Sequence, residues 1–267
     1  MTQSDSAFDT LILDRPRADV LQVTLNRPAV RNAFNTRMAT ELLGIFQQFN
    51  RDCEGLRAVV LTGAGDQAFC AGADLKERRG MDEATWRRQH KIFEDMAGAI
   101  MDCPLPVIGA INGAAYGGGC ELALACDFAY ASRDAKFALT EVTIGLIPGI
   151  GGTQNLPRRV GIARAKEILL TGRPFSADDA LSWGLVNRLC EPETLIPEAL
   201  ASAERIADNA PLAVAQAMRA VDAGSDTSLA QGLSVELDCY DKLVGTQDVA
   251  EGINAFNEKR RPRFKGQ

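Results

Sequence analysis

Two carboxylates near a run of glycines are the residues of this chain best suited to chemistry. The segment Gly117–Glu121 combines backbone N–H groups that no side chain shields with an acid on the same side of a helical first turn. A second acid, Glu141, interrupts the apolar run 137–148, where burial raises a carboxyl pKa toward the range used in proton transfer. Backbone donors beside acids are what enolate chemistry on a carbonyl compound requires.

Each of these features also has a plainer interpretation. An acid in a first helical turn stabilises the helix dipole by about 0.3–1 kcal/mol, so Glu121 alone does not indicate catalysis. Residues 63–68 match the dinucleotide fingerprint G-x-G-x-x-A after a buried strand, but no second strand follows where a nicotinamide-binding unit needs one. The small residues 70–73 allow a ligand close to the backbone, and the glycine-rich loop 148–153 leads into a helix without a P-loop lysine.

Composition excludes several classes of protein. The chain has 267 residues, 46% of them hydrophobic and 24% charged, which is typical of a globular protein with one large core. Its net charge of −6 and the absence of any membrane-length apolar run argue against nucleic-acid and membrane partners. Seven cysteines without C-x-x-C spacing indicate reduced thiols, and the short acidic start resembles no targeting peptide, so we expect a cytoplasmic protein or a chain that has already been processed. The single histidine, His90, is expected on a solvated helix face, which argues against a zinc site and a Ser-His-Asp triad.

Alternating strands and helices must position the two acids. Period-two or continuous apolar runs predict strands over residues 10–13, 20–25, 57–62, 107–111, 128–131 and 137–139. Asn35 caps a predicted helix over 36–49, and a second, polar helix is expected over 82–101. Beyond Gly161 helical periods dominate, with one further strand expected over 184–189. The pattern indicates an α/β core followed by a C-terminal helical section.

Several ordered motifs resemble the crotonase superfamily, the enoyl-CoA hydratase/isomerase family, over essentially the whole chain. The matching segments are Leu25–Pro28 with Asn32–Phe34, Ala68–Lys76, Ile111–Gly113, Gly117–Asp127, Glu141–Thr153 and the basic tail that ends in Pro262–Phe264. The resemblance implies a spiral of ββα turns over residues 1–200 and a helical oligomerisation section over 201–267. It also implies assembly into a homotrimer or homohexamer.

The resemblance also implies a site for acyl-CoA thioesters. The thioester oxygen would lie between the backbone N–H groups of Ala73 and Gly118, which form an oxyanion hole. Glu121 and Glu141 would be the catalytic acids, and no metal or redox cofactor is expected, since coenzyme A is part of the substrate. The other residues that would contact substrate are Ala71, Gly72, Asp74, Leu75, Lys76, Tyr116 and Gly117. The basic tail 259–265 would contribute to solubility, or contact the CoA phosphates or a neighbouring subunit.

Hydratases of the superfamily carry two glutamates and enoyl isomerases usually one, so the resemblance favours an enoyl-CoA hydratase of fatty acid metabolism. The alternatives are isomerisation, hydrolysis, decarboxylation or retro-aldol cleavage of an acyl-CoA. Residues 75–78 with Met81 also resemble the methylglutaconyl-CoA hydratase branch, some of whose members bind RNA, and Arg87, Arg88 and Lys91 could support such binding. Two positions depart from the pattern: Tyr116 replaces a smaller aliphatic residue, and Asn155 stands where arginine is common.

Overall fold

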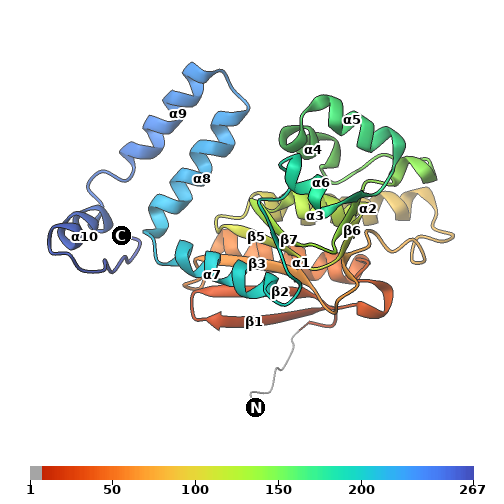
Figure 1. The fold of residues 1–267 in the computed structure, drawn as a ribbon, viewed down its shortest axis with the longest axis horizontal. Coiled ribbons are helices and arrows are strands. Elements are labelled where there is room, and N and C mark those ends of the chain that lie inside the picture. The colour runs from red at the N-terminus through yellow and green to blue at the C-terminus, as the bar shows by residue number, and fades with distance from the viewer. Residues whose placement is uncertain (1–7) are drawn as a thin grey trace, which may run out of the picture.

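Two β-sheets form the centre of the computed structural model, which describes residues 8–267 (Figure 1). The larger sheet has the order β1-β2-β3-β5-β7-β10, with strands Leu11–Arg17, Val20–Leu25, Ala58–Gly63, Val107–Ile111, Phe128–Ser132 and Arg188–Cys190. The smaller sheet has the order β4-β6-β8-β9, with strands Ala68–Cys70, Ala114–Tyr116, Lys136–Ala138 and Phe175–Ser176. The pairs β1–β2 and β8–β9 are antiparallel, and every other pair is parallel.

The chain winds through the two sheets in a repeated step. The strand pairs β3–β4, β5–β6 and β7–β8 each place one strand in the larger sheet and the next strand in the smaller one. Helix α2 (Glu83–Met101) follows β4, helix α3 (Gly118–Ala125) follows β6, and the 3₁₀ turn η2 (Glu141–Ile144) follows β8. This is a ββα spiral, and the α/β fold with C-terminal helices that the sequence predicts is confirmed.

Local sequence explains where the first two long helices begin. Helix α1 (Thr36–Arg51) starts after Asn35, whose side chain accepts the N–H of Met38, as its position before an amphipathic run predicts. Helix α2 starts after Asp82, whose side chain accepts the N–H of Thr85. A short 3₁₀ turn, η1 (Pro28–Val30), precedes α1. These caps fix the residues at which α1 and α2 begin.

The larger sheet is buried on both faces because its strands alternate between two apolar clusters. In β3, Val59 and Leu61 join the main core, whereas Ala58 and Val60 face a second cluster that includes helix α7 (Leu195–Ala207). The sequences of parallel strands that are covered on both faces are continuous apolar runs. For this reason the sequence predicts β3 and β5 correctly.

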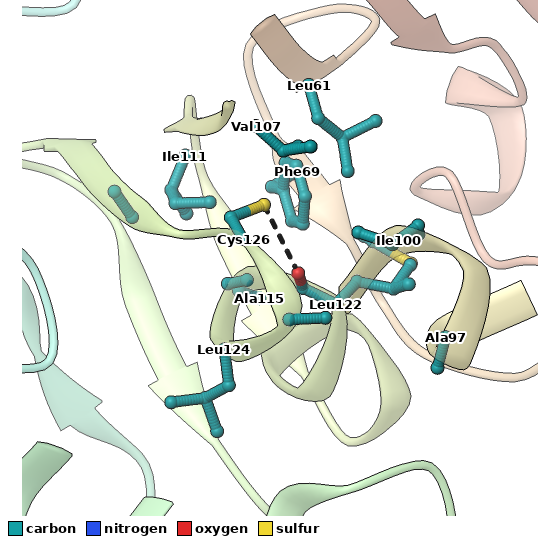
Figure 2. Close-up of a cluster of buried hydrophobic side chains, with 14 of the residues drawn as sticks. Leu61, Phe69, Ala97, Ile100, Val107, Ile111, Ala115, Leu122, Leu124 and Cys126 are labelled. Carbon is teal, nitrogen blue, oxygen red and sulfur yellow. Dashed lines mark hydrogen bonds between the residues drawn. The ribbon is translucent and has the colours of Figure 1, made fainter. Parts of the chain in front are cut away.

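The main core joins both sheets to α2 and α3. Figure 2 shows Leu61 of β3, Phe69 of β4 and Ile111 of β5 around α3, close to Ile100 of α2. The thiol of Cys126, at the end of α3, donates to the carbonyl of Leu122 at 3.4 Å, so its weak donor is satisfied inside the apolar cluster. Helix α3 is therefore held on all sides, and the residues of its first turn take fixed positions.

Helices make up most of the chain after η2. They are α4 (Gly152–Val160), α5 (Ile162–Thr171), α6 (Ala177–Ser182), α7, α8 (Pro211–Ser225), α9 (Leu229–Asp241) and α10 (Gln247–Asn257). Helix α7 packs on the larger sheet, whereas α8 and α9 form a hairpin that projects away from the sheets, with α10 beyond it (Figure 1). The division of the chain into a core over 1–200 and a helical section over 201–267 stays a prediction. Between residues 8 and 267 no helix has the length and apolar composition needed to cross a membrane.

The secondary structure differs from the sequence-based expectation in two ways. The strands β4, β6 and β9, of two or three residues each, are absent from the prediction, because each is too short to show a period. The strand expected over 184–189 is wrong in position: Gly184 adopts a φ of 81°, and the strand β10 begins at Arg188. Gly184 therefore ends the helical turn after α6 instead of opening the strand.

Candidate active site

The carboxyl ends of β4, β6 and β8 meet at one edge of the smaller sheet, and this edge collects the predicted site. Parallel pairing places the residues after β4, 71–73, beside those after β6, 117–118. The next pair brings Glu141, three residues after β8, to the same edge, and the N–H of Gly117 donates to the carbonyl of Ala138 at 2.8 Å. Segments about 45 residues apart in sequence therefore face one another because of the spiral.

The backbone N–H of Ala73 is free to bind a ligand. The N–H of Phe34 donates to Gly72 O and the N–H of Asp74 donates to Phe34 O, both at 2.9 Å. Ala73 and Phe34 form an isolated parallel β-bridge, in which Phe34 bonds to the residues before and after Ala73. The N–H of Ala73 itself therefore points away from Phe34. Within residues 8–267 no backbone oxygen accepts it.

Gly118 supplies a second free N–H close to the first. It is the first residue of α3, where an N–H has no partner inside the helix. Its nitrogen lies 3.2 Å from the position that a Cβ on Gly72 would take, and Ala73 N lies 3.7 Å from the corresponding position on Gly118. The two glycines let the backbones approach, so two unpaired amides lie beside each other.

Glu121 is buried one turn into α3 and is held by the loop before α4. Its residue is 3% exposed, and its Oε1 accepts the N–H groups of Ile150 at 2.9 Å and Gly152 at 2.8 Å. Burial raises the pKa of this carboxyl, while the backbone N–H donors of the loop oppose that shift by favouring the charged form. The carboxylate is thus fixed in orientation, with Oε2 left for another partner.

Glu141 has the opposite environment. Its Oε2 is buried without a hydrogen-bond partner among the described residues, and only the backbone N–H of Glu141 itself favours the charged form. Burial raises the pKa of Glu141 to about 7, and the nearby Glu121 carboxylate adds to this shift. The expectation that a lone acid in this apolar run has a raised pKa is confirmed.

Gly117 links the two acids. Its carbonyl accepts the N–H of Glu121 at 3.1 Å, and a Cβ on it would lie 3.2 Å from Glu141 Oε1. With a φ of 52° and that close approach, this position suits glycine alone. One carboxyl poised to accept a proton and one poised to donate it therefore lie beside two free amides, an arrangement suited to general acid–base chemistry on a carbonyl compound.

The remaining predicted contact residues lie around this edge. Asp74 is not free, because it pairs with Arg27 at 3.0 Å and accepts the N–H of Lys76 at 3.1 Å. Leu75 and Lys76 are exposed beyond it, while Ala71 is half-buried. Tyr116 ends β6, and its carbonyl lies 2.8 Å from the position of a Cβ on Gly72, so this residue contributes backbone packing to the site.

Three contributors to the site were not identified from the sequence. The loop 149–152 was interpreted only as the start of a helix, yet its N–H groups hold Glu121. Phe34 packs against Gly118, since its Cζ lies 2.6 Å from the position of a Cβ there. His90 lies on α2 as expected and is one-third exposed, but its ring also packs on the loop before α4, where its Cε1 lies 2.5 Å from the position of a Cβ on Gly149. The contacts of Phe34 with Gly118 and of His90 with Gly149 could have been suggested by a search for glycines that leave room for an aromatic ring.

Two charged features predicted to contact anions have partners within the chain. Arg260 of the tail pairs with Glu251 and Glu258, and Arg57 donates to the carbonyl of Phe264 at 2.7 Å, so the tail folds back on the protein. On α2, Arg87 pairs with Glu83 and Lys91 with Asp95. Within residues 8–267 no group of three or more His, Cys, Asp and Glu side chains comes together as a candidate metal site.

Comparisons with known proteins agree with this geometry. A family model described as enoyl-CoA hydratase/isomerase matches residues 15–267. The mitochondrial enoyl-CoA hydratase of Pongo abelii is 42% identical over 253 residues, which are 92% of this chain and 83% of that protein. The crotonyl-CoA hydratase of Syntrophomonas wolfei is 38% identical over 258 residues, 97% of this chain and 98% of that protein.

The likeness extends to three dimensions. The crystal structure of an enoyl-CoA hydratase from Bacillus anthracis has a TM-score of 0.94 with this chain at 43% identity, covering 97% of this chain and 100% of that one. A match that covers 97% of this chain leaves no large segment outside the shared fold. The chain belongs to the enoyl-CoA hydratase/isomerase family.

Proposed function

We propose that this chain is an enoyl-CoA hydratase that adds water across the C2=C3 bond of a 2-enoyl-CoA thioester to give a 3-hydroxyacyl-CoA. The observation that carries the proposal is the pair Glu121 and Glu141 beside the free N–H groups of Ala73 and Gly118. Names of relatives at about 40% identity over the full chain support the same reaction.

The two amides bind the thioester oxygen. Negative charge develops on this oxygen as water adds to C3, and donors fixed before the reaction stabilise that charge without rearrangement. Each such donor lowers the barrier by roughly 3–4 kcal/mol. Residues 71–76 and Tyr116–Gly117 flank the bound thioester, with Lys76 exposed where the CoA moiety leaves the site.

The two acids divide the proton transfers. The N–H groups of Ile150 and Gly152 favour the charged form of Glu121 against the effect of its burial, and in that form it accepts a proton from water as hydroxide forms a bond to C3. Glu141, whose pKa is raised to about 7, is protonated in a large fraction of molecules near neutrality and gives its proton to C2. The two carboxyls together hold one proton before and after the reaction. Transfer of that proton from Glu121 back to Glu141 restores the starting state.

The environment of Glu121 favours hydration over isomerisation. Moving a double bond between C3 and C2 needs one group that removes and returns a proton, a task that Glu141 alone can perform. Glu121 is held by two backbone donors and is directed at the same edge, an arrangement that an isomerase does not need. The pair of ordered acids therefore supports the hydratase.

Coenzyme A enters this reaction as part of the substrate, the addition of water causes no net oxidation or reduction, and the two carboxyls carry the protons, so the proposal includes no cofactor. Seven free cysteines, six of them buried, support a cytoplasmic location, since reduced thiols are typical of that compartment. The ion pairs of Arg87 and Lys91 on α2 support the absence of a nucleic-acid partner.

The last three helices support assembly into a homotrimer or homohexamer. Their surface carries large apolar side chains that remain more than one-third exposed: Leu212, Val221, Leu229, Leu233, Leu237, Tyr240, Val249, Ile253 and Phe256. An exposed apolar surface of this kind is rare on a monomer and is typical of a subunit interface. The projecting α8–α9 hairpin gives this surface access to neighbouring copies (Figure 1).

The direct test is incubation of the protein with crotonyl-CoA, with loss of the ultraviolet absorbance of the enoyl thioester as the readout. Turnover that yields 3-hydroxybutyryl-CoA supports the proposal. Parallel incubation with 3-enoyl-CoA separates the isomerase: formation of 2-enoyl-CoA from it, without hydration of crotonyl-CoA, contradicts the hydratase.

A further inference from the structure

His90 is the single histidine of the chain, and the mechanism above gives it no role. It lies on α2 and is one-third exposed, and its Nε2 is 3.3 Å from Oε1 of Glu94, one turn further along the helix. The Cε1–Nε2 edge of the same ring faces Gly149, in the loop before α4. A side chain of α2 therefore packs on the loop that holds one of the two acids.

The contact between His90 and Gly149 is close. A Cβ on Gly149 would lie 2.5 Å from Cε1, 2.9 Å from Nε2 and 3.8 Å from Nδ1 of His90, and these are the three atoms nearest to that position. The φ of Gly149 is not in the left-handed region, so the backbone conformation at this position also suits alanine. Glycine is needed at 149 because of the imidazole and not because of the backbone.

Gly149 connects this contact to Glu121. Its backbone N–H, like those of Ile150 and Gly152, lowers the pKa of the Glu121 carboxyl against the effect of burial. The residues on either side of Gly149 are buried, whereas Gly149 itself lies at the surface, where His90 is the side chain nearest to its Cβ position. The imidazole thus rests on the residue at which the donors for Glu121 begin.

A second contact with α2 holds the other end of the loop. Nδ2 of Asn155, the residue that stands where arginine is common in the family, donates to Sδ of Met101 at 3.2 Å. The backbone N–H of Asn155 donates to the carbonyl of Gly151 at 2.8 Å. Met101 follows His90 by about three helical turns, so the two contacts lie on one face of α2. The loop is therefore held at both ends by a helix that packs in the main core.

We propose that His90 is a positioning residue for Glu121: its imidazole packs on Gly149 and holds the loop 149–152 where the N–H groups of the loop meet the carboxylate. The inference rests on the proposed hydratase function and adds a residue to the same site. A general base must lie at hydrogen-bond distance from the water that it deprotonates, so a small displacement of Glu121 lowers the rate of the chemical step.

Kinetics of His90→Ala separates this role from a purely structural one. Without the ring the loop loses its place, so kcat for crotonyl-CoA should fall by about tenfold or more while KM stays within about twofold. Weaker N–H donors raise the pKa of Glu121, so the acidic limb of kcat/KM should move to higher pH by about half a pH unit or more. An unchanged kcat with an unmoved limb, or a rise in KM alone, overturns the inference.

Two further variants of α2 control for folding. His90→Gln, whose amide can reach the position of Nε2, should keep kcat within about threefold of the wild type. Arg87→Ala removes an exposed side chain one turn before His90 and should leave both kcat and the pH profile unchanged. Circular dichroism melting of each variant shows that it is folded at the assay temperature. A His90→Gln variant as impaired as His90→Ala contradicts a role for the contact with Gly149.

An exchange of space between the two residues tests the contact itself. Gly149→Ala places a methyl group against the imidazole and should lower kcat by about tenfold or more. In the double variant His90→Ala/Gly149→Ala the methyl group has room, so kcat should rise again to about the level of His90→Ala alone. Gly98→Ala, where nothing lies within 4 Å of the new methyl group, is the matched control. A loss that is the same with and without His90 contradicts the inference.

Hydrogen–deuterium exchange of the loop is a readout that needs no substrate. The peptide over 149–156 includes the N–H groups bonded to Glu121, and its exchange should be at least about fivefold faster in His90→Ala, with the peptide over α10 unchanged. Equal exchange in the two proteins contradicts the inference. A wild type that does not hydrate crotonyl-CoA contradicts the proposed function itself, whereas a hydrating wild type whose loop and rate do not depend on His90 contradicts only the inference.

Discussion

The backbone N–H of Gly152 donates to Oε1 of Glu121 at 2.8 Å, so the first residue of α4 holds a carboxylate that lies in the first turn of α3. A Cβ on Gly152 would lie 3.0 Å from this same oxygen, which leaves little room for any other residue there. The contact fixes one acid of the pair, while Glu141 keeps a buried oxygen without a partner. The difference between the two acids leads to separate predictions for each.

Replacement of Glu121 by Gln should lower kcat for hydration of crotonyl-CoA by about 10²- to 10⁴-fold, because the general base is lost. The amide oxygen of Gln still accepts the N–H groups of Ile150 and Gly152, so thermal unfolding should change little. Steady-state kinetics with circular dichroism melting measures both quantities. Glu94→Gln, at a half-exposed acid on α2, is the matched control and should retain activity; a Glu121→Gln variant of wild-type rate contradicts the assigned role.

The pKa of Glu141, raised to about 7, makes kcat/KM depend on pH. The protonated form is needed to give a proton to C2, so kcat/KM for hydration should fall as pH rises above about 7. At low pH, protonation of Glu121, whose pKa is also raised by burial, should lower the rate again and give a bell-shaped profile. A rate that is flat from pH 6 to 9 argues against Glu141 as the proton donor.

The same pKa predicts a change in stability. Because the folded-state pKa of Glu141 lies above the unfolded value of 4.5, its contribution to stability is present below pH 4.5 and lost as pH rises through about 7. Glu141→Gln removes this loss and should stabilise the protein at pH 8 by about 1–2 kcal/mol, after allowance for partial exposure to solvent. Urea unfolding at pH 5 and pH 8 measures the effect, and an equal change at both pH values is the contrary result.

Gly119 is expected to be the least replaceable glycine of α3. A Cβ there would lie 2.0 Å from the carbonyl oxygen of Cys70, which is backbone and cannot rotate away. Gly119→Ala should therefore destabilise the fold by about 3 kcal/mol or more in urea unfolding. Gly98→Ala in α2, where nothing lies within 4 Å of the new methyl group, should instead stabilise by about 0.5–1 kcal/mol. Similar effects of the two variants would show that α3 does not pack on β4 as described.

The apolar surface of α9 should control assembly. Leu237 is 60% exposed in the single chain, and burial of a charge at this position in a subunit interface is costly. Leu237→Lys should shift the sedimentation-equilibrium mass from a trimer or hexamer toward the monomer. Glu236→Lys, which adds a cation one residue away, should leave the mass of the assembly unchanged. A wild type that sediments as a monomer refutes the homo-oligomer.

The sequence was sufficient to predict the spiral fold because its motifs resemble a known family, and because strands such as β3 are continuously apolar. It was not sufficient to show why the site forms. Strands β4 and β6 have three residues each and carry no periodic signal, yet their parallel pairing is what brings Ala73 to Gly118. Hydrogen bonds from the loop 149–152 to Glu121 join segments 29 and 31 residues apart, and local pattern contains no information on such contacts.

The packing of His90 on this loop was not predicted, for a related reason. A polar residue in a charged helix reads as solvated, but Gly149, 59 positions later in the sequence, lets the imidazole pack onto the loop that holds Glu121. Arg78 shows the same effect, because its burial depends on Trp86 and Phe93 from α2. Side chains whose environment comes from distant segments are therefore those that the sequence describes least well.

Hydration of crotonyl-CoA in D₂O, followed by proton NMR of the product at low conversion, tests most directly whether the two acids act together on one face of the substrate. If Glu121 and Glu141 hold one water on one face of the substrate, 3-hydroxybutyryl-CoA carries a single deuterium at C2 on the same face as the new hydroxyl. Equal labelling of both faces at C2, or no hydroxylated product at all, contradicts the account.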